Sequence, residues 1–156
     1  MQKQITIHTK HLNIQLSQNA VRQSQALTSR LIVEIQVYFS CLLGKRLVFY
    51  SEQPVEGTWL LEADEFENIF DEAQQISDNL YLRFNTVMTK SCPVSDYIGP
   101  PPVSDFKIRN QKPYVPDWLS IDYNDNLWSG QYGWKSSDQH FKNTKQVRSQ
   151  AISTKK

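Results

Sequence analysis

The apolar run from Leu31 to Leu43 constrains the fold of this chain more than any other stretch. Placed at 100° per residue, Ile35, Tyr38 and Leu42 each fall within about 40° of Leu31, as on one face of a helix. The run continues upstream through residues 19–30 without a strong turn signal, which is long for a strand and ordinary for a helix. The pattern therefore predicts a long central helix over residues 19–43.

The residues after this run support the same prediction. Gly44 stands where a helix end favours a residue that can adopt positive φ. Lys45 and Arg46 follow, with the charge that suits the negative end of a helix dipole.

A strand is the alternative for the second half of the run. Residues 31–43 also alternate with period two and are rich in β-branched side chains. In this alternative a helix breaks near Thr28-Ser29, a strand follows, and Gly44-Lys45 forms a two-residue turn into a further strand at Arg46–Ser51.

Alternating and amphipathic patterns predict the remaining elements. Strands are expected at residues 5–7, 12–16, 46–51, 58–62, 80–89, 118–123 and 127–132, with an amphipathic helix over 64–76. Asn124, Asp125 and Asn126 supply the turn of a C-terminal hairpin. The predicted architecture is one α+β domain over residues 1–134, with the long helix packed on a mostly antiparallel sheet.

Charge and composition narrow the classes of partner. Residues 135–156 lack hydrophobic periodicity and are basic, so they are expected to form a disordered tail. The formal net charge of the whole chain is only +1, which argues against bulk attraction to nucleic acid or to an anionic membrane.

The same sequence predicts a cytoplasmic protein. The N-terminus shows no apolar region of a secretory signal, and no window is long and apolar enough for a membrane span. The chain has two cysteines far apart, Cys41 and Cys92, which do not make a disulfide framework.

Cys92 is the first candidate site residue. It lies with Asp96 where a predicted strand ends and a proline-rich segment begins, a common place for functional groups. A neighbouring base could activate its thiol, and proximity to Cys41 would allow a redox pair. The base would have to be one of the three histidines, His8, His11 and His140. Packing of an unreactive thiol is the alternative for both cysteines.

A proline- and aromatic-rich region is the second candidate, for binding a ligand or a partner. The prolines are Pro100, Pro101 and Pro102, and the aromatic residues are Trp118, Tyr123, Trp128, Tyr132 and Trp134. Exposed rings of the hairpin could receive a sugar or another small molecule, although core packing would equally explain them. Residues 114–134 contain no Lys or Arg, so nucleic acid is not expected here.

Motifs for phosphate, metal or serine-hydrolase chemistry are missing from the sequence. No glycine-rich phosphate loop or Gly-x-Ser-x-Gly elbow occurs, and His8-x-x-His11 lacks the paired cysteines of a zinc site. No metal or cofactor is therefore expected. The sequence favours a non-enzymatic module that binds another protein, with a thiol-dependent enzyme and a small-molecule or sugar binder as alternatives.

Overall fold

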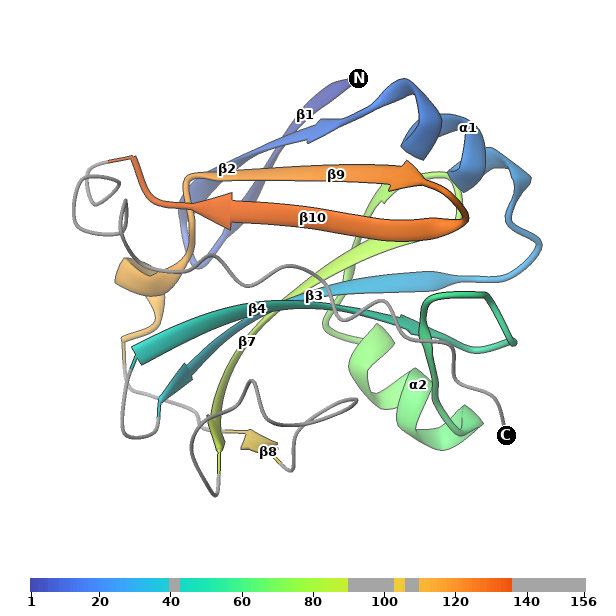
Figure 1. Cartoon of the computed structure of the whole chain (residues 1–156). Coiled ribbons are helices and arrows are strands. Elements are labelled where there is room, and N and C mark those ends of the chain that lie inside the picture. Colours follow the sequence, from blue (N-terminus) through green and yellow to red (C-terminus); the bar gives the residue numbers. More distant parts are fainter. Residues whose placement is uncertain (40–42, 90–102, 106–109, 136–156) are drawn as a thin grey trace.

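The computed structural model describes residues 1–39, 43–89, 103–105 and 110–135. Within these residues the chain is mostly β, with two sheets and two short α-helices (Figure 1). The first sheet has four strands in the order β1-β2-β9-β10: β1 (Gln2–Ile7), β2 (Lys10–Leu16), β9 (Trp118–Asn124) and β10 (Leu127–Gly133).

The second sheet has six strands. Their order is β5-β4-β3-β7-β6, with β8 paired to β7. The strands are β3 (Leu31–Phe39), β4 (Leu43–Ser51), β5 (Trp59–Leu60), β6 (Gln74–Ser77), β7 (Leu80–Thr89) and β8 (Val103–Asp105).

The prediction of an α+β domain with a long central helix is wrong, because the described chain is mostly β. Helix α1 (Gln18–Ala26) ends before Leu31, and the apolar run forms β3, between antiparallel β4 and parallel β7. The predicted turn residue Gly44 lies inside β4, opposite Tyr38. The strand alternative, with a break after α1, is the one that the structure adopts.

The position of β3 explains why its periodicity was ambiguous. One set of alternate side chains, including Leu31, Val33 and Ile35, faces the core between the sheets. The other set also contains apolar residues, such as Ile32, which is fully buried. A strand buried on both faces has apolar side chains at odd and even positions, and some of them coincide with a helical period.

Several shorter elements are confirmed. The strands β1 and β2 form an antiparallel hairpin, and β9 and β10 form the predicted C-terminal hairpin. Its turn residues Asp125 and Asn126 both have positive φ, at 53° and 64°, as in the tight turns that Asn and Asp tolerate. The predicted helix over 64–76 is too long, because α2 (Ala63–Phe70) ends before β6.

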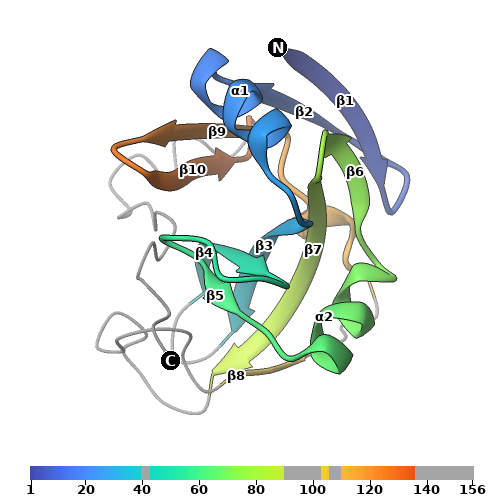
Figure 2. The ribbon, with the colours of Figure 1, turned by 90° about the vertical axis from the view of Figure 1, so that its right-hand side faces the viewer.

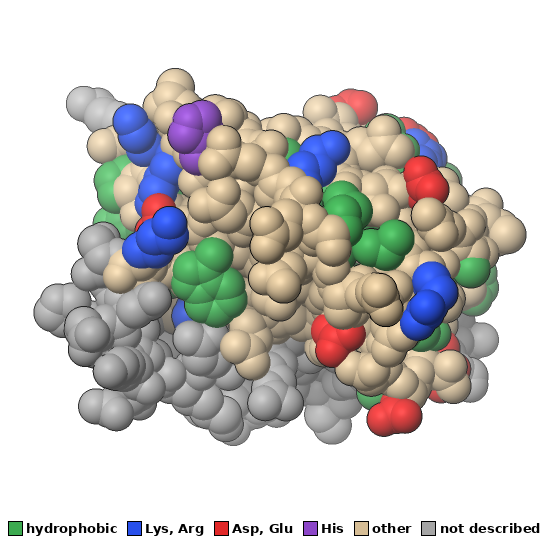
Figure 3. Space-filling model, turned by 90° about the horizontal axis from the view of Figure 1, so that it is seen from above, with side chains coloured by type: hydrophobic (Ala, Val, Ile, Leu, Met, Phe, Trp, Pro, Cys, Tyr) green, Lys and Arg blue, Asp and Glu red, His purple; other side chains and the backbone are tan. Residues whose placement is uncertain are grey.

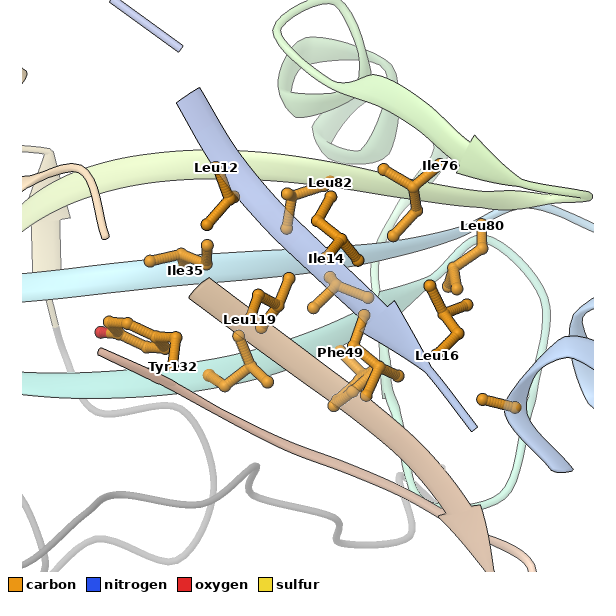
Figure 4. Packing of buried hydrophobic residues seen from close by; sticks show 14 of the residues in the cluster. Leu12, Ile14, Leu16, Ile35, Phe49, Ile76, Leu80, Leu82, Leu119 and Tyr132 are labelled. Atoms are coloured by element: carbon orange, nitrogen blue, oxygen red, sulfur yellow. The ribbon is translucent and has the colours of Figure 1, made fainter. Parts of the chain in front are cut away.

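The core lies between the two sheets (Figure 4). Leu12, Ile14 and Leu16 of β2 meet Ile35 of β3 and Phe49 of β4, and all five are at most 1% exposed. Such close burial of branched and aromatic side chains from both sheets is the main stabilising contribution expected in a sandwich of this kind.

Each helix covers a different part of the molecule (Figure 2). Helix α1 begins at Ser17, whose hydroxyl accepts from the N–H of Ala20 at 3.0 Å, and packs near β9. Helix α2 lies on the outer face of the six-stranded sheet. There the ring of Phe70 packs edge-on against the ring of Tyr81, with 4.7 Å between the ring centroids. The tail predicted over 135–156 lies outside the described residues, except for Lys135.

Candidate functional site

Part of the predicted site lies outside the described residues. This applies to Cys41, Cys92, Asp96 and Pro100–Pro102. The thiol hypothesis and the proline-based binding hypothesis therefore stay predictions.

The predicted hairpin aromatics divide between the core and the surface. Trp128 and Tyr132 are at most 1% exposed and Trp134 is 8% exposed, so these three rings fill the core. Tyr123 is partly exposed and packs edge-on against Trp128 at 5.0 Å. Trp118 is partly exposed and lines a groove on the opposite face of the hairpin.

A larger cleft opens where the edges of the two sheets meet. It has a volume of about 780 Å³, within the usual size of a small-molecule site. Strands β1 and β6 lie beside each other at this edge (Figure 2), and the amide of Gln74 donates to the carbonyl of Thr6 at 3.0 Å. The cleft is lined by Thr6, Ile7, His8, Thr9, Glu72, Gln74, Leu82, Phe84, Asn110, Gln111 and Lys112.

The lining of the cleft is mostly polar, and its apolar residues are Ile7, Leu82 and Phe84. Leu82 is 1% exposed and Phe84 is partly buried, and both come from β7. The ring of His8 stands edge-on to Phe84, with 6.1 Å between ring centroids. The partly buried Ile7 and Phe84 therefore supply most of the apolar surface of the cleft.

Two strained residues form part of the rim. His8 and Thr9 make the turn between β1 and β2 with φ of 51° and 65°. This region is unfavourable for most residues with a Cβ, and especially for a β-branched residue such as Thr, whereas His adopts it more often. Strain of this kind concentrates at functional sites, so it adds to the case for the cleft.

A buried network holds the carboxylate of Glu72 at the cleft wall. Arg83 donates from Nε and Nη2 to Oε1 of Glu72, at 2.9 and 2.7 Å. Its Nη1 donates to Oε2 of Glu34 at 2.7 Å, and Asn85 donates to the same oxygen at 2.9 Å. Glu34 and Arg83 are 3% and 5% exposed, so the guanidinium is fixed between a buried acid and the cleft.

Further polar side chains lie beside this network on the outer face of the six-stranded sheet. Gln36 is 2% exposed and donates to the hydroxyl of Tyr50 at 3.4 Å, and its Oε1 accepts no bond from the described residues. Burial lowers the pKa of Arg46 to about 10, so the guanidinium stays charged at neutral pH. Gln36 and Arg46 lie opposite each other on β3 and β4, and both side chains are buried.

The cleft presents several groups that can form hydrogen bonds. The described part of its lining contains no Cys or Ser, and the described residues hold no group of three His, Cys, Asp or Glu side chains that could bind a metal ion. Arg83 donates to Glu72 but is shared with Glu34, so one guanidinium faces two carboxylates, whereas Lys112 and His8 bring positive or donor groups to the rim. The cleft therefore suits a ligand with an apolar body and an acceptor or anionic substituent.

Sequence reasoning missed most of the cleft. The sequence predicts His8 as a candidate base for Cys92, and it places Glu72 within the amphipathic helix expected over residues 64–76. The one local signal was a hairpin turn at His8-Thr9 that lacks the Asn or Gly expected there.

Comparison of the chain with protein-family models, with curated proteins and with solved structures finds no match. In the part of the chain that the structure describes, neither helix has the length and apolar character needed to cross a membrane.

Proposed function

We propose that this protein is a binding module that holds a small organic anion in the cleft. The observation that carries the proposal is an open cleft of about 780 Å³ that combines the partly buried ring of Phe84 with polar side chains. A cytoplasmic location and a lack of enzymatic activity remain parts of the same proposal.

The shape and charge of the cleft define the ligand. Ile7 and Phe84, both partly buried, offer apolar contact to a ring or short hydrocarbon body. Lys112, on the rim, supplies an ammonium group for a carboxylate, whereas Glu72 is already engaged by Arg83. The ligand is therefore expected to carry one anionic group.

Native mass spectrometry of the purified full chain tests whether a ligand accompanies the protein. An excess mass that disappears on denaturation would identify a bound molecule by its mass.

NMR titration with benzoate, benzamide and benzamidine then tests the charge preference, because these probes share a ring and differ in charge. Benzoate should shift the amide signals of His8, Phe84 and Lys112 at the lowest concentration. Lys112→Ala should bring the affinity for benzoate down to that of benzamide.

The histidine His11 provides a matched control for His8. It belongs to the same hairpin but does not line the cleft. His8→Ala should weaken benzoate binding, whereas His11→Ala should leave it unchanged. Preferential binding of benzamidine, or shifts that avoid the cleft for all three probes, would contradict the proposal.

A further inference from the structure

The outer face of the four-stranded sheet carries a second candidate site, separate from the cleft. Successive side chains of a strand point to opposite faces of the sheet, so every second residue of each strand lies on the exposed face. One row across the sheet is Gln4, Asn13, Trp118 and Gly133, and the adjacent row is Gln2, Gln15, Ser120 and Gln131. Seen from above, most of this surface is neither charged nor hydrophobic (Figure 3).

These rows border a shallow groove of about 400 Å³. The groove, here called the amide groove, is lined by Gln2, Lys3, Gln4, Asn13, Ile14, Gln15, Trp118, Leu119 and Ser120. Lys3 is the one charged residue among them, and four of the nine carry a side-chain amide. Nε2 of Gln4 donates to Oδ1 of Asn13 at 2.9 Å, which orients two of these amides. Each amide has both donors and acceptors for a partner rich in hydroxyl groups.

Trp118 lies flat across the neighbouring strand because residue 133 is glycine. A Cβ at Gly133 would lie 2.9 to 3.1 Å from Cζ2, Nε1 and Cε2 of the Trp118 indole, so the ring occupies the space that a side chain would fill. The indole remains partly exposed. A flat, partly exposed indole beside oriented amides is a surface on which a planar apolar face can stack while its polar edge forms hydrogen bonds.

We propose that the amide groove binds a neutral oligosaccharide of β-linked glucopyranose units. Glucopyranose in its chair form places its hydroxyls around the ring edge and its axial C–H bonds on the two faces. The C–H face matches the ring of Trp118, and the hydroxyls match Gln4, Asn13 and Gln15.

The charge of the groove excludes other partners. Single-stranded nucleic acid also stacks on aromatic rings, but its sites include a basic groove, and Lys3 alone does not supply one. An extended peptide adds to a sheet through the backbone of an edge strand, whereas this groove lies on the face of the sheet. A neutral polyhydroxyl ligand is the partner that fits both the ring and the amides.

Isothermal titration of the full chain with cellohexaose tests the proposal, with α-linked maltohexaose as the comparison. Saturable binding of cellohexaose is expected, and Trp118→Ala should weaken it by about tenfold or more. Trp118→Phe should retain most of the affinity, because a flat ring remains. Gln4→Ala and Gln15→Ala should each weaken binding. Both side chains are exposed, so these variants are expected to fold even if Trp118→Ala does not.

Two control variants test whether cellohexaose binds in the amide groove. Ser129→Ala changes the same sheet face outside the groove, and His8→Ala changes the cleft; neither should affect cellohexaose. The proposal is overturned if cellohexaose shows no saturable binding, if maltohexaose binds instead, if the groove variants bind unchanged, or if His8→Ala abolishes binding.

Discussion

The hydroxyl of Tyr132, on β10 of the four-stranded sheet, donates a 2.6 Å hydrogen bond to the backbone carbonyl of Gln36 on β3 of the six-stranded sheet. The same hydroxyl accepts from the backbone N–H of Arg46 on β4 at 3.0 Å. A single side chain thus satisfies two buried backbone groups of the opposite sheet and joins the two layers at this edge. Close approach there is possible because residue 130 is glycine: a Cβ would lie 2.6 Å from a methyl group of Leu47.

Tyr132→Phe should therefore destabilise the protein. The variant keeps the ring but leaves the Gln36 carbonyl and the Arg46 N–H without this partner, at a cost of about 1–3 kcal/mol. Urea denaturation should show a lower midpoint with an unchanged slope. Tyr123→Phe serves as the control, since Tyr123 is partly exposed, and its cost should stay within about 0.5 kcal/mol. Equal losses in the two variants would contradict the bridging role.

Loss of the Arg83 guanidinium should destabilise the protein much more than loss of the Glu72 charge. Arg83→Met leaves buried Glu34 without its guanidinium, and breaking a buried ion pair in this way costs about 3–5 kcal/mol. Glu72→Gln alters the partner whose side chain is 52% exposed, so it should cost less than about 1 kcal/mol. Chemical denaturation at pH 7 measures both. Similar losses of stability in the two variants would show that the buried pair of Arg83 and Glu34 does not contribute more than the pair of Arg83 and Glu72.

The ion pair of Arg30 and Glu52 should make stability depend on acid pH. Hydrogen bonds from Arg30 hold the pKa of Glu52 below its ordinary value of 4.5. The folded state thus favours the ionised form, and its contribution is fully present above pH 4.5 and lost as the pH falls through the lower folded pKa.

Glu52→Gln should consequently flatten the decline in stability below pH 4.5, measured by urea denaturation at several pH values. Glu56→Gln, which changes an exposed acid of the same loop, is the control. A decline of equal steepness in the wild type and in Glu52→Gln would refute this assignment.

A substitution in the turn at the rim of the cleft should increase the stability of the protein. Thr9 has a φ of 65°, which costs about 1–2 kcal/mol for a residue with a Cβ. Thr9→Gly removes this cost but adds chain entropy in the unfolded state, so a net gain of about 0.5 kcal/mol is expected. Thermal denaturation should show a higher midpoint. Thr6→Gly, inside strand β1, should have the opposite effect, and a loss in both variants would argue against strain at Thr9.

The local sequence was sufficient to predict the two terminal hairpins. Leu12, Ile14 and Leu16 alternate with polar residues because one face of β2 meets the core and the other meets solvent. At the other end of the chain, Asp125 and Asn126 take up the positive φ that their short side chains tolerate. In both cases the pattern and the turn lie within a few residues of one another.

Contacts between residues far apart in the sequence determine the secondary structure of residues 31–39 and bring the residues of the cleft together. Residues 31–39 are compatible with either period, and they form a strand because β4 and β7 pair with them on both sides. His8, Glu72 and Lys112 come from separate parts of the chain, and no spacing in the sequence relates them.

The sequence by itself determined the elements whose hydrophobic period and turn residues are local, namely the hairpins and the strand from Leu80. Only the tertiary structure decided that Leu31–Phe39 is a strand, that the indole of Trp118 lies over Gly133, and that Arg83 joins Glu34 to the cleft. The physical reason is that pairing and burial depend on which distant strands become neighbours, and that information is not contained in any one segment.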